Sequence, residues 1–332
     1  MPETLPCISY ETRSQWLLQR ISILRGNPNF VAAAVEYAQG IVRIFEGKYM
    51  ANKVIANVAR HVICSSILAL HFNEKHHGAS VSHLQHITSA SGLCSPNTTA
   101  ATINFLERIG AVTRVRDESD HRNHLILPSD RLILHTRSIV GVALSAADKL
   151  FPLRHYQQLM ESADDFIERY FAASLHSLLN LNTLISSFHG SRLFADSDSG
   201  SILLCKLMSL KQPFADTATV VLPFDDIGQL YGVSRTHIRR LMKKAEGEGF
   251  VRLLENGGRK VEILPPLNDV FENMVASHVA REQFNIHLAN EDYDLLPMDR
   301  CALRRRGEDV VTSFHFDPVT VSTEESRGLF IR

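Results

Sequence analysis

One short segment of the chain concentrates cationic side chains of the kind that bind polyanions. Between Ser234 and Lys260 eight Lys or Arg residues stand against three Glu, a local balance of +5, whereas all 332 residues together carry a formal net charge of −1. Cationic side chains release counterions when they contact phosphates, and arginine can also donate two hydrogen bonds to a guanine edge. The segment therefore predicts a local nucleic-acid surface. Its candidate residues are Arg235, Thr236, His237, Arg239, Arg240, Lys243, Lys244, Arg259 and Lys260.

The surrounding spacing predicts the elements that would position these side chains. Ser234 is a favourable N-cap, because its hydroxyl can accept from the free amides of a first helical turn. Residues 224–231 predict a short helix before the tight turn at Gly232, and residues 249–265 predict a hairpin. The basic residues face away from an apolar stripe at helical spacing, formed by Ile238, Leu241, Met242 and Ala245. Helix, turn, basic helix and hairpin together predict a helix-turn-helix with a wing.

The basic segment also resembles a known class of regulators. VSRTHIRRLMKKAEGEGFV is similar to the recognition helix of GntR-like and Crp-like bacterial proteins, including the glycine before the first wing strand. The resemblance covers about residues 200–266, which we call the second module. It implies a winged helix-turn-helix fold whose basic helix docks in the major groove of double-stranded DNA. The alternative is an ordinary solvated basic face.

A less charged copy of the same pattern lies 139 positions earlier. The shift places Ser95 at the helix cap and Pro96 at the first helical position, where its missing amide costs nothing. The wing sequence Asp120-His121-Arg122 resembles that of MarR-type regulators. This resemblance covers about residues 50–145, which we call the first module, and it implies that Arg122 reaches the minor groove.

The first module departs from the second in charge. From Ser95 to His124 four Arg balance four acidic residues, and no cation occupies the outward helix positions. Asparagine can form two hydrogen bonds with the edge of adenine, so this helix could read bases while binding phosphate weakly. Equally, the module could keep the fold and contact a protein. Its candidate DNA-binding residues are Asn97, Thr98, Asn104, Arg116 and Arg122.

Periodicity along the whole chain predicts a mainly α fold with small β wings, in which long helices join two winged helix-turn-helix domains. Helices are expected over Val81–Ala90, Ser95–Ile109, Ser201–Leu210 and 267–289, and a loop over Gly190–Ser201, where Ser, Asp and Gly cluster. The expected order is an N-terminal segment (1–27), a helical scaffold with the first module (28–150), linking helices (151–195), the second module with a C-terminal helix (196–289) and an irregular tail (290–332).

The MarR resemblance also suggests why one chain carries two modules. MarR-like proteins bind DNA as two-fold dimers whose long terminal helices form the interface. Here the helices within 28–72, 129–189 and 267–289 could form that interface inside one polypeptide, as a single-chain pseudo-dimer. Two unlike recognition helices would then enter successive major grooves. The predicted target is an asymmetric operator, bound by a monomer of this kind or by a homodimer.

Other functions stay open on the same residues. Plasmid-type replication initiators also carry tandem winged helices, and they would bind directly repeated origin sequences. An adaptor or structural protein would use winged helices for protein contacts, which the neutral first helix favours and the +5 segment opposes. The sequence contains no GxGxxG, GxxxxGK[ST], GxSxG or HExxH motif, so catalysis is not expected.

Composition predicts a cytoplasmic protein without a cofactor. Five scattered cysteines with no CxxC pair are typical of reduced thiols, and neither a leader nor an apolar run predicts secretion or a membrane span. The histidine-rich segment 71–86 fits no metal-ligand spacing, so no metal is expected. Cys94 could sense oxidants, although a structural thiol is the commoner case.

A small-molecule effector is allowed by the MarR resemblance, since such regulators can hold phenolic or lipophilic ligands between the DNA module and the helical interface. For aromatic residues at helical spacing, core packing is the default. The residues compatible with such a pocket are Trp16, His71, Phe72, Tyr156 and Phe166.

Overall fold

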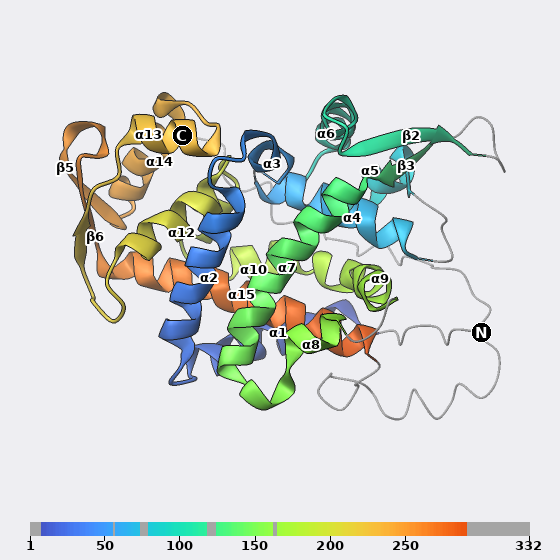
Figure 1. Ribbon diagram of the computed structural model, residues 1–332, viewed down its shortest axis with the longest axis horizontal. Helices are drawn as coiled ribbons and strands as arrows, with labels where there is room; N and C mark the ends of the chain where they lie inside the picture. Colours follow the sequence, from blue (N-terminus) through green and yellow to red (C-terminus); the bar gives the residue numbers. More distant parts are fainter. Residues whose placement is uncertain (1–7, 56, 74–78, 118–123, 162–164, 291–332) are drawn as a thin grey trace, which may run out of the picture. The chain divides into compact units, whose positions relative to one another are not determined.

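The computed structural model describes residues 8–55, 57–73, 79–117, 124–161 and 165–290. Within them the chain is mainly helical and holds two three-stranded antiparallel sheets, so the mainly α class with small β elements is confirmed (Figure 1). The irregular tail and Arg122 lie outside the described residues.

The first half of the described chain contains seven α-helices and one small sheet. Its elements are α1 (Tyr10–Arg25), α2 (Phe30–Phe45), α3 (Tyr49–Val54), α4 (Val58–His71), β1 (Ala79–Ser80), α5 (Val81–Ala90), α6 (Pro96–Arg108), β2 (Val112–Arg116), β3 (His124–Pro128) and α7 (Asp130–Leu150).

The second half continues with short helices before its own sheet. Its elements are the 3-10 turn η1 (Pro152–Arg154), α8 (Tyr156–Glu161), α9 (Phe166–Leu178), α10 (Leu181–Ser186), α11 (Ser191–Ala195), α12 (Gly200–Leu210), β4 (Ala218–Val220), α13 (Phe224–Tyr231), α14 (Arg235–Gly247), β5 (Val251–Glu255), the turn η2 (Asn256–Gly258), β6 (Lys260–Ile263) and α15 (Pro265–Ala289).

The two modules repeat the same order of elements. In each, a helix leads to a short strand, two helices, two strands and a long helix, and the strand orders β1-β3-β2 and β4-β6-β5 correspond. The 139-residue offset relates both ends of α6 to those of α14, and both ends of β2 to those of β5. The internal repeat expected from the sequence is therefore present in the backbone.

The helix exits match in their hydrogen bonds as well. The amide of Ala111 donates to the carbonyl of Leu106 at 2.9 Å, and that of Phe250 donates to Ala245 at the same distance. Between them stand Gly110 (φ 69°) and Gly249 (φ 74°), in the left-handed conformation that glycine adopts without a Cβ penalty. Helices α6 and α14 thus end in the same αL turn, and each leads directly into a strand.

The long helices cross between the two halves of the chain. Helix α2 packs on α7 of its own half and on α12 of the second half, whereas α9 packs on α15 and on α4 of the first half. Similarly, α1 packs on α15, α8 packs on α7, and α7 packs on α15. The scaffold is therefore built by reciprocal exchange of helices between two related halves.

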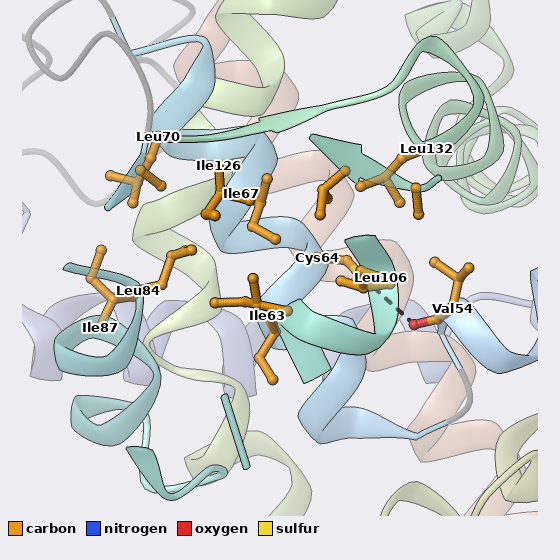
Figure 2. Packing of buried hydrophobic residues seen from close by; sticks show 14 residues of the cluster. Val54, Ile63, Cys64, Ile67, Leu70, Leu84, Ile87, Leu106, Ile126 and Leu132 are labelled. Carbon is orange, nitrogen blue, oxygen red and sulfur yellow. Dashed lines mark hydrogen bonds between the residues drawn. The ribbon is translucent and has the colours of Figure 1, made fainter. Parts of the chain in front are cut away.

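The core of the first module lies around α4. Ile63, Cys64 and Ile67 are fully buried there, and they pack with residues of α5, α6 and β3 that Figure 2 shows converging from several sides. The Cys64 thiol donates to the carbonyl of Val54 at 3.6 Å. Because α4 also packs on α9, this core joins the module to the crossing helices.

Two segments have more helix than the sequence predicts. The N-terminal segment contains α1, and Ser9 is the N-cap of this helix. The Ser9 hydroxyl accepts from the amide of Thr12 at 3.1 Å. The predicted loop Gly190–Ser201 contains α11 and the start of α12, and α11 packs on α12, α14 and α15. In both places contacts with distant parts of the chain stabilise helix where the local sequence is ambiguous.

Candidate nucleic-acid interface

Helix α14 presents its basic residues to solvent because its other face is anchored. Ile238, Leu241, Met242 and Ala245 are all buried, and the Ser234 hydroxyl accepts from the amide of His237 at 3.1 Å. The predicted cap and apolar stripe are therefore confirmed. The side chains that the opposite face exposes are Arg235, Thr236, Arg239, Arg240, Lys243 and Lys244.

A close approach of two helices fixes the angle at which α14 leaves α13. The amide of Val233 donates to the carbonyl of Gly228 at 3.0 Å. A Cβ on Gly228 would lie only 2.7 Å from the carbonyl oxygen of Val233, so this contact requires glycine. The tight turn predicted at Gly232 is also present, with φ 70° at that residue.

Most cations of this segment have no anionic partner inside the protein. Arg235 pairs with Asp225 at 3.1 Å, and Arg252 pairs with Glu262 at 2.7 Å. Among the described residues no ion pair involves the other six, namely Arg239, Arg240, Lys243, Lys244, Arg259 and Lys260. A cluster of unpaired, exposed cations is what phosphate binding by counterion release requires.

Glu246 and Glu248, the two acidic residues at the end of α14, contact groups other than its basic residues. The Glu246 carboxylate accepts from the amide of Leu253, at 2.8 Å, on strand β5. Glu248 lies 3.8 Å from His189. The positive potential of the exposed helix face is therefore not offset by these neighbouring carboxylates.

The hairpin β5–β6 stands beside the start of α14. The carbonyl of Gly258 in its turn accepts from the amide of Leu222 at 2.8 Å, which ties the turn to the segment before α13. Arg259 and Lys260 follow directly and are exposed. The tip of the hairpin therefore adds two cations next to the basic helix.

His237 differs from its neighbours on α14. Its ring is only partly exposed, and Nε2 donates to the carbonyl of Asp198, at 2.9 Å, in the connection between α11 and α12. The sequence groups His237 with the DNA-facing residues, but in the structure it contacts the scaffold. It acts as an anchor for the first turn of α14.

The first module exposes a polar surface with little net charge. Asn97, Thr98, Asn104 and Arg116 are all exposed. The Asn104 side-chain oxygen accepts from Arg114 at 3.0 Å, and Arg114 also pairs with Glu107 at 3.2 Å. This network neutralises the nearest arginine and occupies the oxygen that Asn104 would need to read adenine with two hydrogen bonds.

The residues compatible with an effector pocket take part in ring contacts within the protein. Trp16 packs edge-on against Phe284 with ring centroids 5.5 Å apart, and Phe72 stacks on Phe171 at 5.7 Å. Tyr156 lies edge-on to His287 at 5.7 Å. None of the five lines the cavity of the helical scaffold, and core packing accounts for these ring contacts.

The cavity lies instead among helices α2, α4, α10, α11, α12 and α15. Its polar wall includes Arg281, His278 and His61, none of which stands out in the sequence as a site residue. The one signal is the spacing of His278, Arg281 and Asn285 on α15, which places three polar residues along one side of a helix whose last turns are buried.

Cys94 has the properties of a structural thiol. Its sulfur donates to the carbonyl of Ala59 at 3.4 Å, and burial raises the pKa of the thiol to about 11. Oxidants react with thiolates, so this environment opposes a sensing role. Over the described ranges no three His, Cys, Asp or Glu side chains gather as a metal site, and part of the histidine-rich segment falls outside those ranges.

No helix in the described part of the chain combines the length and apolar character needed to cross a membrane. Comparison of the chain with protein-family models, curated proteins and solved structures gives no match. The functional argument therefore depends on the geometry of the chain itself.

Proposed function

We propose that the protein is a sequence-specific regulator that binds double-stranded DNA through α14 and the β5–β6 hairpin. The observation that carries the proposal is a group of six exposed cations, none of them ion-paired within the described residues: four lie on α14, whose opposite face is buried, and two lie on the hairpin. A helix of this kind fits the major groove, where arginine can read guanine and lysine can bind the flanking phosphates. In this arrangement α14 and the hairpin form a winged helix-turn-helix.

The repeated modules support a single-chain pseudo-dimer. The two halves exchange helices reciprocally, as α2 and α9 do, and this is how two subunits of an intertwined dimer would be joined. Because α6 and α14 expose different residues, the two half-sites would differ in sequence. The expected operator is asymmetric, and half of it provides most of the affinity.

The test is selection of genomic fragments by the purified chain at about 150 mM salt, where weak phosphate contacts are screened. Arg240→Ala is compared with Arg252→Ala, because Arg252 is a cation already paired with Glu262. Enrichment of promoter fragments with two unlike half-sites, lost only in Arg240→Ala, supports the regulator. Strictly palindromic sites bound by two chains contradict the pseudo-dimer, and directly repeated origin sequences indicate a replication initiator.

A second candidate function concerns the first module alone. The ion pair of Arg114 with Glu107 leaves its helix with little affinity for phosphate, and Arg114 also engages the side-chain oxygen of Asn104. That observation favours protein contact by this module, with DNA binding left to the second module in the proposed function. Crosslinking of the DNA-bound protein distinguishes the two, because a protein-contact role leaves Asn97 and Thr98 uncrosslinked to DNA.

A further inference from the structure

The scaffold contains a partly open cavity of about 120 Å³ with mostly apolar walls. Ile41 and Phe45 of α2, Phe194 of α11 and Leu204 of α12 form part of these walls. An apolar cavity of about 150 Å³ is large enough to hold benzene. The cavity of this protein is smaller but partly open, so it has room for an apolar group no larger than about one ring.

One cation is buried at the wall of this cavity. Arg281 on α15 is 3% exposed, and its Nε has no hydrogen-bond partner. No ion pair involves it among the described residues. Because arginine keeps its charge in proteins, burying a guanidinium without a partner costs free energy, and a bound anion would offset that cost.

The neighbouring acid does not serve as the counter-ion. Glu282 is the next residue on α15, and consecutive residues of a helix point in different directions. Its carboxylate instead accepts from the Tyr170 hydroxyl and from the Asn285 amide at 3.3 Å. Glu282 therefore directs its hydrogen bonds to Tyr170 and Asn285 and forms no ion pair with Arg281.

Two imidazoles, those of His61 and His278, also lie at the cavity wall. The Nε2 atom of His61 is buried and has no partner, while His278 is hydrogen-bonded to the Tyr37 hydroxyl. Burial lowers the pKa of His278 to about 3, and burial also holds the pKa of His61 well below its usual range. Neither imidazole adds a second charge, so the site carries one positive charge beside an apolar cavity.

We propose that this cavity binds a small monocarboxylate with a compact apolar body, whose carboxylate pairs with Arg281 and contacts His61. The guanidinium supplies paired donors that match a carboxylate in geometry, and the apolar walls enclose the rest of the ligand. The volume restricts the body to about one ring or a short branched chain.

The site occurs in one half of the repeat only. The 139-residue offset relates His61 to Gly200, and the 135-residue offset between the starts of α7 and α15 relates Arg281 to Ala146. Neither the imidazole nor the cation has a counterpart. The chain would therefore bind one ligand, unlike a symmetric dimer with two equivalent sites.

A short chain of hydrogen bonds connects the cavity wall to α14. Asn57 lines the cavity, and its amide donates to the Asp198 carboxylate at 2.7 Å. The carbonyl of the same Asp198 accepts from His237 in the first turn of α14. If the proposed function holds, occupation of the cavity changes the position of α14 and hence DNA affinity.

The binding test uses the full chain without DNA. Calorimetric titration and thermal unfolding are measured with benzoate, and with benzamide as a neutral molecule of the same shape; acetate, butyrate and cyclohexanecarboxylate complete the series. We expect benzoate or cyclohexanecarboxylate to bind and raise Tm, with benzamide at least tenfold weaker. Equal binding of benzamide, or no binding by any carboxylate, would overturn the proposal.

Variants separate the site from general effects of removing an arginine. In Arg281→Met an apolar side chain of similar length replaces the buried charge, a change that often leaves folding intact or stabilises it. We expect this variant to fold and to lose carboxylate binding at least tenfold. Arg25→Met, which removes a cation paired with Asp269 and Glu272 elsewhere on α15, should bind normally. Unchanged binding by Arg281→Met contradicts the proposal.

The regulatory step is tested separately by DNA-binding assays with and without the carboxylate. A ligand-dependent change in DNA affinity in the wild type, absent in Arg281→Met, supports coupling. If the ligand binds but DNA affinity does not change, the coupling is wrong and the site stands. If the protein binds no DNA at all, the proposed function fails, while the calorimetric result still decides the ligand site.

Discussion

His237 and Asp198 join the basic helix to the scaffold through one hydrogen bond, from the imidazole Nε2 to the backbone carbonyl at 2.9 Å. The acceptor is a main-chain atom, so only a change at position 237 can remove the contact without moving the backbone. His237 therefore sets the orientation of the first turn of α14 relative to α11 and α12. A variant without the His237 imidazole therefore tests the effect of helix orientation on DNA binding, apart from the effect of direct DNA contacts.

We expect His237→Ala to weaken DNA binding roughly two- to tenfold, because the lost hydrogen bond contributes about 0.5–1.5 kcal/mol to that orientation. The preferred DNA sequence should not change. Fluorescence anisotropy with the selected site and with single-base variants measures both quantities. His237→Gln, which keeps an N–H donor, should recover part of the affinity. A changed base preference in His237→Ala would show instead that the imidazole touches DNA.

Arg240→Ala should cost about 1–3 kcal/mol on the preferred site if the guanidinium makes a paired contact with guanine. The reason is its exposure without an ion pair on the outer face of α14. Arg252→Ala should cost much less, since Glu262 already neutralises that side chain. Salt titrations of both variants provide the measurement. A uniform loss over unrelated sequences, with a salt slope smaller by about one, would make Arg240 a phosphate anchor.

Local signals were sufficient for the elements around α14. The N-caps Ser95 and Ser234, the glycines after both helices and the helix Val81–Ala90 all follow from short-range spacing and were predicted correctly. These features depend on backbone chemistry within a few residues, so neighbours in the sequence suffice to define them. The internal repeat can therefore be recognised from the amino-acid sequence alone.

Elements stabilised by distant contacts were not predicted. Helix α1 buries a narrow apolar side with Leu17, Ile21 and Leu24, and it also buries Arg13, whose guanidinium donates to Asn180 at 3.0 Å. A polar residue with its partner 167 positions away carries no local signal. The environment of Arg281 was missed for the same reason, because its walls come from α2, α4 and α12 as well as its own helix.

The charge network of the first module gives a third prediction. Glu107→Gln removes the carboxylate that pairs with Arg114, so it should free a cation beside Asn104. If the first module faces DNA, total DNA affinity should rise about two- to tenfold, most clearly at low salt. Glu255→Gln on the hairpin of the second module is a control for the general effect of removing one acid. Equal effects of the two variants would show that Glu107 acts through net charge and not through its place beside Arg114.

Buried histidines predict a loss of stability in mild acid. Burial lowers the pKa of His278 to about 3 and those of His135 and His176 to about 4, and it lowers the pKa of His61 in the same direction. Above about pH 6.5 these imidazoles are neutral in the folded and unfolded chain alike. Below it the unfolded chain takes up protons that the folded protein does not, so the free energy of unfolding falls.

Each such histidine contributes up to about 1.4 kcal/mol per pH unit between its unfolded and folded pKa. Urea unfolding at pH 7.5, 6.5 and 5.5 should therefore show constant stability at the upper end and a clear fall at the lower end. His135→Gln is the informative variant, because the His135 ring lies edge-on to Phe45 and its Nε2 has no partner. Its slope below pH 6.5 should be shallower than that of the wild type. If the slopes agree, His135 is protonated in the folded protein and must lie in a more solvated position than the structure gives it.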